Sequence, residues 1–152
     1  MKKGFTLLEL IVVIVILGIL ATLGYTQYTK ITEKMRIAEA VANIGKMRKY
    51  AIGYYMENGT YTTITAADLG IGSSSDQLPN TCNSSTYFYY QFFFPSPPNI
   101  ELSAVRCTAG GKQPNYSGGN KYWIYMGLLP SGSGELKCWD SVTGLDLSWC
   151  RP

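Results

Sequence analysis

An apolar run near the start of the chain constrains the fold more than any other feature. From Phe5 to Leu23 the sequence FTLLELIVVIVILGILATL contains a single charged residue, Glu9. A helix of this length rises about 29 Å, close to the roughly 30 Å hydrocarbon core of a bilayer. The run therefore predicts a membrane-spanning helix, and it raises the question of why a carboxylate lies near its beginning.

Two further features indicate which side of the membrane the rest of the chain occupies. Lys2 and Lys3 precede the apolar run, and cations flanking a spanning helix favour the cytoplasmic side. The chain also has four cysteines without a C-x-x-C pair, a pattern that favours disulfides in an oxidising compartment over a zinc site. They are Cys82, Cys107, Cys138 and Cys150. We therefore expect the N-terminus inside and the remainder outside.

The helical pattern continues beyond the apolar run. Apolar residues recur at spacings of three, four and seven, which predicts one amphipathic helix that leaves the membrane and enters water. They are Ile31, Ile37, Ala38, Val41, Ile44, Gly45, Ala51, Ile52 and Tyr55, with Lys30, Glu33, Arg36, Glu39, Asn43, Lys46 and Lys49 expected on other faces. Asn58 and Gly59 predict the end of the helix. The resulting rod, residues 5–58, would be about 80 Å long.

Composition argues against catalysis and nucleic-acid binding. The chain of 152 residues contains no histidine, which removes the commonest general base and transition-metal ligand. Its net charge of +3 falls to +1 without Lys2 and Lys3, so charge gives no argument for nucleic-acid binding. We expect no enzymatic activity and no cofactor.

The segment GFTLLELIVVIVILGIL resembles the cleavage and methylation segment of type IV prepilins and of the pseudopilins of type II secretion systems. The shared features are a short basic leader that ends in Gly4, Phe5 after the cut, and Glu9 as the fifth mature residue. The resemblance implies that a membrane prepilin peptidase cuts after Gly4 and methylates the new amino terminus of Phe5. It is strong over residues 1 to about 30, weaker through ENGTYTT, and absent beyond.

The resemblance also implies a function for Glu9. Phe5 and Glu9 are four residues apart and so share a helix face. A carboxylate in a membrane costs about 2.5–3.5 kcal/mol on insertion scales, so a nearby ammonium is favoured. In the family's assembly model Glu9 pairs with the Phe5 ammonium of a neighbouring subunit. The alternative is a Glu9 that only reaches the lipid headgroups.

Many pilins have a proline at the twenty-second mature residue, where this chain has Thr26. Any melting of the helix during assembly would therefore depend on Gly18 and Gly24. We expect no kink at Thr26.

The outer half of the chain predicts a small antiparallel sheet. Strand-like runs at 87–94, 100–108, 121–127 and 135–140 are separated by Pro-, Gly- and Ser-rich segments. Residues 65–70 predict a capped helical turn, and residues 72–86 a Ser/Asn-rich loop. The amphipathic half of the helix is the natural cover for this sheet, so we expect an α+β, pilin-like fold. The expected domains are a leader at 1–4, the long helix at 5–58 with 5–24 in the membrane, and a globular head at 59–152.

Three finer expectations concern the head. Of three possible disulfide pairings, we favour Cys82 with Cys107 and Cys138 with Cys150. Alternate rings of TYFYYQFFFP should pack under the helix while the others fill subunit contacts, although sugar binding or electron transfer would also suit aromatic residues. Asp140 and Asp146 offer oxygen ligands for calcium, a minority hypothesis.

We therefore expect the subunit of a homo-oligomeric filament. It would be inserted in the cytoplasmic membrane, processed by prepilin peptidase, and assembled by a separate ATPase and inner-membrane platform into an extracellular pilus. Two alternatives stay open at this stage. One is a pseudopilin that forms a short periplasmic pseudopilus, and the other is a secreted binding module whose signal peptide is cut near Ala21 or Gly24.

Overall fold

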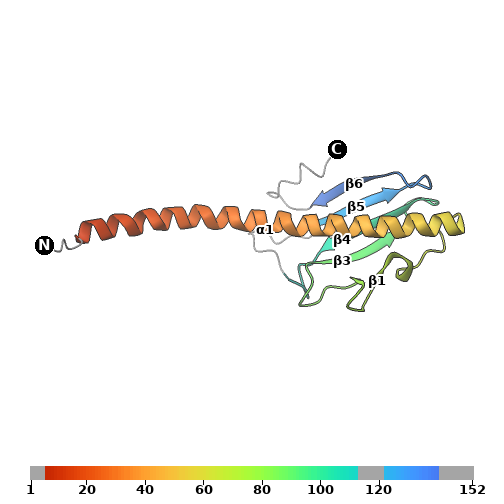
Figure 1. Ribbon diagram of the computed structural model, residues 1–152, viewed down its shortest axis with the longest axis horizontal. Helices are drawn as coiled ribbons and strands as arrows, with labels where there is room; N and C mark the ends of the chain where they lie inside the picture. The colour runs from red at the N-terminus through yellow and green to blue at the C-terminus, as the bar shows by residue number, and fades with distance from the viewer. Residues whose placement is uncertain (1–5, 113–121, 141–152) are drawn as a thin grey trace.

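The computed structural model describes residues 6–112 and 122–140. One helix, α1 (Leu7–Asn58), runs for 52 residues and projects far beyond the head (Figure 1). Gly59 ends α1 in the left-handed conformation, φ 71°, with its N–H donating to the carbonyl of Tyr55. The predicted end of the helix is therefore confirmed, and the residue type explains it, because glycine enters this conformation without a Cβ penalty.

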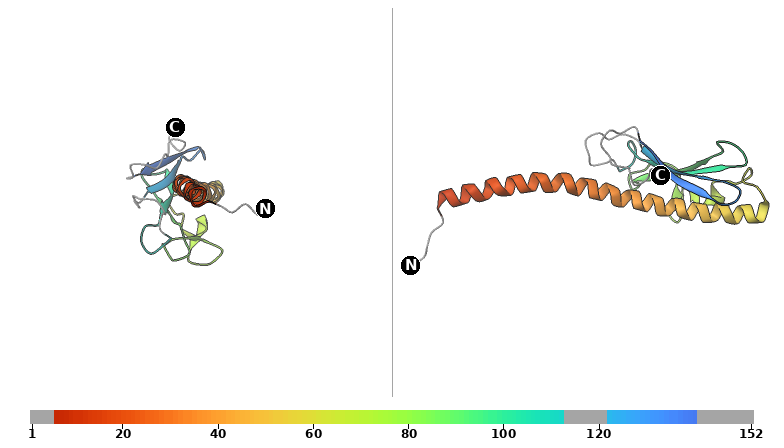
Figure 2. Two further views of the ribbon diagram at one scale, coloured as in Figure 1. Left: turned by 90° about the vertical axis from the view of Figure 1, so that its left-hand side faces the viewer. Right: turned by 90° about the horizontal axis from the view of Figure 1, so that it is seen from above.

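The helix is continuous through both glycines of its apolar half and through Thr26, and it curves gently (Figure 2). A Cβ added at Gly18 or Gly24 would meet nothing within 4 Å. The Thr22 hydroxyl donates to the carbonyls of Gly18 and Ile19, both at 2.9 Å. Such bonding to the preceding turn is tolerated in helices and often bends them slightly.

A four-stranded antiparallel sheet lies against the second half of α1. Its strands, β3 (Phe88–Phe93), β4 (Ile100–Arg106), β5 (Tyr122–Leu128) and β6 (Gly134–Asp140), follow one another in sequence order across the sheet. All four predicted strands are confirmed to within two residues at each end. The helix packs on β4 and β5 and covers one face of the sheet, which confirms the expected α+β, pilin-like architecture (Figure 2).

The buried stripe of α1 is narrower than the sequence predicted. Its members follow strict alternating spacings of four and three, as Glu33, Ile37, Ala40, Ile44, Met47 and Ala51. The prediction was wrong for Ile31, which is 57% exposed, and for Ala38, which is also exposed. The sheet contacts one narrow face of the helix. Ile31, two residues before Glu33, and Ala38, directly after Ile37, lie on other faces.

A short connecting region joins the helix to the sheet. It contains the 3₁₀ turn η1 (Ala67–Leu69) and a parallel pair of two-residue strands, β1 (Ile71–Gly72) and β2 (Leu78–Pro79). The predicted capped turn is confirmed, since the Thr65 N–H and hydroxyl both donate to the Asp68 carboxylate. The β1–β2 pair was not predicted: Gly72 and β2 lie within the loop expected at 72–86, and Ile71 directly precedes it.

Candidate functional site

The apolar half of α1, residues 7–25, has no cover within this chain. Every residue from Thr6 to Tyr25 is exposed, and the most hydropathic 18-residue window has no part buried. In the part of the chain that the structure describes, α1 is the one helix long and apolar enough to cross a membrane. Apolar surface of this extent in water is strongly unfavourable. The apolar half therefore requires lipid or other protein around it.

Glu9 closes the N-terminal end of this helix. Its Oε2 accepts hydrogen bonds from the Thr6 N–H at 2.9 Å and from the Thr6 hydroxyl at 2.8 Å, while the Glu9 N–H donates to Thr6 Oγ1 at 3.3 Å. This arrangement is a capping box, which satisfies N–H groups that the first turn leaves without helical partners. This capping box was not predicted, although Thr-x-x-Glu, here Thr6 to Glu9, is its sequence signature.

The predicted partner of Glu9 lies outside the described residues. Gly4 and Phe5, the expected cleavage and methylation positions, are not described. Glu9 Oε1 has no hydrogen-bond partner among the described residues. A carboxylate accepts several hydrogen bonds at once, so the capping role of Oε2 leaves Oε1 for a second donor.

The second functional cluster fixes the helix to the sheet. Glu33 of α1 is 1% exposed and receives two bonds from Arg106 of β4, Nε to Oε1 at 2.6 Å and Nη2 to Oε2 at 3.3 Å. The Tyr122 hydroxyl of β5 also donates to Oε1, at 2.8 Å. We call Glu33, Arg106 and Tyr122 the anchor cluster. It joins three elements, α1, β4 and β5.

The anchor cluster satisfies both of its buried charges. Arg106 Nη1 donates to the carbonyls of Tyr87, Cys107 and Lys112. Burial alone would raise the pKa of Glu33, but the hydrogen bonds and charge of Arg106, together with the bonds from Tyr122 and Arg36, hold that pKa below its usual value. The carboxylate therefore stays ionised. It faces a guanidinium whose Nε, Nη1 and Nη2 all donate hydrogen bonds.

Glu33 was expected on a face of the helix other than the apolar one, and this prediction was wrong, because the residue is 1% exposed. The residue lies four positions, about one helical turn, before Ile37 and so belongs to the buried stripe. A charged residue in phase with a buried stripe is the signal that could have suggested an ion pair. Its partner, 73 residues away, was not available from local pattern.

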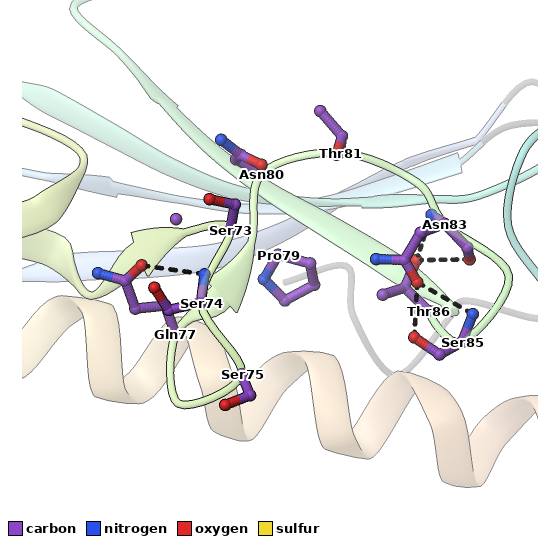
Figure 3. A pocket seen from close by; sticks show the side chains of 11 residues that line it. Ser73, Ser74, Ser75, Gln77, Pro79, Asn80, Thr81, Asn83, Ser85 and Thr86 are labelled. Atoms are coloured by element: carbon purple, nitrogen blue, oxygen red, sulfur yellow. Dashed lines mark hydrogen bonds between the residues drawn. The ribbon is translucent and has the colours of Figure 1, made fainter.

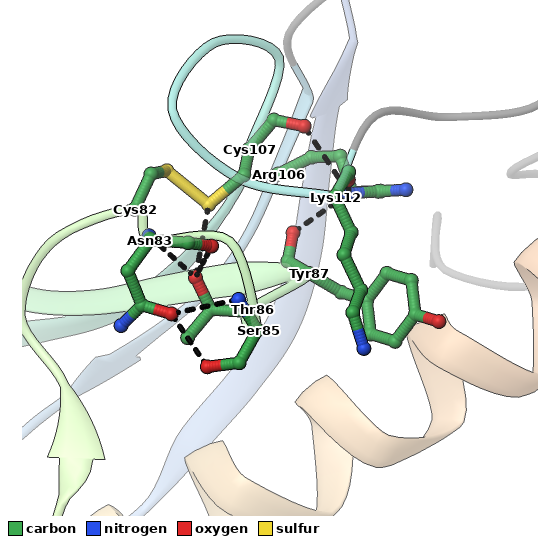
Figure 4. The surroundings of a disulfide bond; sticks show 8 residues. All are labelled: Cys82, Asn83, Ser85, Thr86, Tyr87, Arg106, Cys107 and Lys112. Carbon is green, nitrogen blue, oxygen red and sulfur yellow. Dashed lines mark hydrogen bonds between the residues drawn. A yellow bond between two sulfur atoms is a disulfide. The ribbon is translucent and has the colours of Figure 1, made fainter.

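The disulfide Cys82–Cys107 lies beside the anchor cluster (Figure 4). Its Cα atoms are 5.8 Å apart, and the predicted pairing of these two cysteines is confirmed. Cys138 is also disulfide-bonded, while Cys150, its expected partner, lies outside the described residues. The bridge ties the segment before β3 to the residue that follows Arg106. It therefore supports the carbonyl groups that Arg106 contacts.

Cationic side chains surround the ring of Tyr87 at the same end of the head. The Arg36 guanidinium lies 4.2 Å and the Lys112 ammonium 4.8 Å from its centroid. Cation–π contacts of this kind stabilise partly exposed pairs by about 0.5–1 kcal/mol. They add a second link between α1 and the loop that follows β4.

The aromatic residues of β3 alternate between buried and more exposed positions, as predicted. Phe88 and Tyr90 are 4% exposed, and Phe92 packs against the same core, so alternate rings do lie under the helix. Phe93 is 46% exposed. Its use in subunit contacts stays a prediction.

The calcium hypothesis is not tested by the described residues. Asp146 lies outside them, and Asp140 is described only as the end of β6. Within residues 6–112 and 122–140, no group of three or more His, Cys, Asp or Glu side chains is placed to hold a metal ion.

A head packed on one half of a helix whose other half is exposed and apolar is the arrangement of a subunit anchored in a membrane by that helix half. Residues 1–25 match the prokaryotic N-terminal methylation motif, the prepilin-type signal of type IV pilins and pseudopilins. The motif implies processing by a prepilin peptidase and assembly as a filament subunit of this type. No curated protein and no solved structure shows a significant match to the chain.

Proposed function

We propose that this chain is the structural subunit of a type IV pilus or related extracellular filament. The observation that carries the proposal is the bare apolar half of α1, residues 7–25, continuous with a second half that is fixed to a folded head. Copies of the same helix, packed side by side, would bury this surface without any further partner. The heads would then form the outside of the filament.

The proposed route begins in the cytoplasmic membrane, with Lys2 and Lys3 inside and the head outside. Prepilin peptidase cuts after Gly4 and methylates Phe5. An assembly ATPase and its inner-membrane platform then move the apolar half from lipid into the filament. The membrane-spanning part of the helix, 5–24, becomes the filament core, and the head, 59–152, remains folded throughout.

Glu9 would guide this assembly by pairing with the Phe5 ammonium of a neighbouring subunit. The structure supports the proposal in one respect: the capping box occupies Oε2 and leaves Oε1 without a partner in the described part of the chain. The same carboxylate can therefore cap its own helix and accept an ammonium. In the membrane such a pair would also offset the cost of the carboxylate.

The test separates the charge of Glu9 from its capping role. Glu9→Gln keeps a side-chain acceptor at the position where capping boxes use Glu or Gln, but it removes the charge. We predict normal membrane insertion and at least a tenfold loss of filaments in the sheared cell-surface fraction. Glu39→Gln, on an exposed position of the same helix, should leave filament yield unchanged. Wild-type yield from Glu9→Gln would disprove the pairing.

A pseudopilin of a type II secretion system is the alternative that the shared motif supports. It would form a short periplasmic pseudopilus, and the protein would then be absent from the sheared cell-surface fraction at native expression. The secreted-module alternative requires cleavage near Ala21 or Gly24, which both lie within α1. A cut at either residue would divide the helix.

A further inference from the structure

A polar pocket lies on the flank of the head, between the β1–β2 region and the segment that leads into β3 (Figure 3). Its volume is about 410 Å³, within the range of small-ligand sites. The lining residues are Gly72, Ser73, Ser74, Ser75, Gln77, Pro79, Asn80, Thr81, Asn83, Ser85 and Thr86. None of them belongs to the apolar half of α1 or to the anchor cluster.

The lining of the pocket selects a class of ligand. Every lining residue except Gly72 and Pro79 carries a hydroxyl or an amide, and none carries a charge. An anion would find no cationic side chain there, and a metal ion would find no carboxylate. An apolar ligand would displace water from hydroxyls and amides without replacing its hydrogen bonds. A neutral polyhydroxyl compound needs no charged partner, and its hydroxyls replace the hydrogen bonds of the displaced water.

One wall of the pocket is held in place by Gln77. Its Oε1 accepts from the Ser74 N–H at 3.4 Å, which leaves the amide N–H₂ without a partner among the described residues. The side chain lies over Gly72, and a Cβ at that position would meet the amide end of Gln77. Gly72 therefore leaves room for the Gln77 amide in this position.

The opposite wall is fixed by a hydrogen-bond network and a covalent link. Asn83 Oδ1 accepts from both the N–H and the hydroxyl of Ser85, at 3.0 and 2.6 Å, and the Asn83 N–H donates to Thr86 Oγ1 at 2.9 Å. Cys82, next to Asn83, is bonded to Cys107 of the sheet. Polar groups that are fixed before binding lose less entropy when a ligand arrives.

From these observations we propose that the pocket binds a neutral saccharide. Hydroxyl and amide groups of Gln77, Asn80 and Thr81 would bond the sugar hydroxyls, and the Pro79 ring, which Figure 3 shows between the two walls, would contact a C–H face of the sugar. The pocket lies outside the helix half expected in the filament core. Binding is therefore independent of the proposed filament function and is measurable on the unassembled chain.

The experiment uses the full chain in micelles of a phosphocholine detergent, which carries no sugar. Saturation-transfer difference NMR is recorded with the methyl glycosides of glucose, galactose, mannose and N-acetylglucosamine, followed by titration of any sugar that gives a signal. We expect at least one to bind with a Kd of about 1 mM or tighter. No transfer to any of the four sugars would overturn the proposal.

The location of binding is tested with the double variant Asn80→Ala, Thr81→Ala. Both side chains are exposed and make no side-chain hydrogen bond in the described part of the chain, so the head should keep its fold. We expect at least a tenfold weaker Kd. The matched control is Ser84→Ala, an exposed position in the same loop outside the lining. Equal affinity of the double variant and the control would overturn the assignment to this pocket.

Discussion

At the scale of single residues, Glu33 connects the rod to the head. It is the first buried residue among those of α1 whose burial the structure describes, and it accepts bonds from Arg106 of β4 and Tyr122 of β5. Replacing a buried ion pair with apolar residues is often neutral, whereas removing one partner leaves a buried charge alone. The anchor cluster therefore fixes where the helix packs on the sheet. Loss of one of its charged residues should strongly destabilise the head.

Glu33→Ala should destabilise the head by about 3–5 kcal/mol, because Arg106 would stay buried without its counter-ion. The measurement is chemical denaturation of the full chain in micelles, followed by tryptophan fluorescence, since Trp123 and Trp139 both lie in the sheet. Glu57→Ala, at an exposed position of the same helix, should cost less than about 0.5 kcal/mol. A loss from Glu33→Ala no larger than that control would contradict the proposed role.

The same residue predicts a pH dependence. The folded pKa of Glu33 lies below its usual value of 4.5, so the stabilisation is fully present above the unfolded pKa and is lost as pH falls through the folded pKa. Between pH 7 and 3, the melting temperature of wild type should fall more steeply below about pH 4.5 than that of Glu33→Gln. Asp68, whose pKa is also lowered by its bonds from Thr65, titrates in both proteins. Parallel curves would show that Glu33 does not contribute.

At the scale of elements, the disulfide and the anchor cluster support one another. Cys82–Cys107 closes a loop with a sequence separation of 25, and the loop contains the whole of β3 and β4. On the loop-entropy model such a bridge stabilises the folded state by about 3.5 kcal/mol. It also holds the Tyr87 and Cys107 carbonyls that accept from Arg106.

The double variant Cys82→Ser, Cys107→Ser should therefore lower the melting temperature of the head without melting α1. We expect a loss of about 3 kcal/mol or more at 25 °C, while the far-ultraviolet helix signal at low temperature stays near that of wild type. Ser84→Ala, in the same loop, is the matched control. If the double variant melts like this control, the bridge does not stabilise the head.

Elements set by local chemistry were predictable from the sequence. Gly59 specified the end of α1, and the Pro- and Gly-rich segments on either side of β4 separated the strands, because each acts within a few residues. The docking seam was harder to predict. Both Ile31 and Ile37 suit an apolar face, and the sheet alone decides that Ile37 is buried. The Glu33–Arg106 pair depends on contacts 73 residues apart, for which one sequence gives no pattern.

At the scale of the whole molecule, the chain combines a head that buries its own apolar residues with a helix half that leaves them exposed. The head buries its own core around α1, whereas the apolar half of the helix, residues 7–25, has no cover within the described chain. In the proposed function, lipid covers this apolar half before assembly and neighbouring helices cover it afterwards. The N-terminal motif at residues 1–25 lies at the end of the uncovered half, where cleavage would create the ammonium that Glu9 is proposed to accept.

The most direct test of this account is the N-terminus of the protein on the cell surface. We would determine the intact mass and the N-terminal peptide of the protein recovered in the sheared cell-surface fraction. The account predicts a chain that begins at Phe5 with a methylated amino group, with no peptide from residues 1–4. A mature chain that begins beyond Ala21 would contradict it, because the helix half that is proposed to build the filament core would be missing.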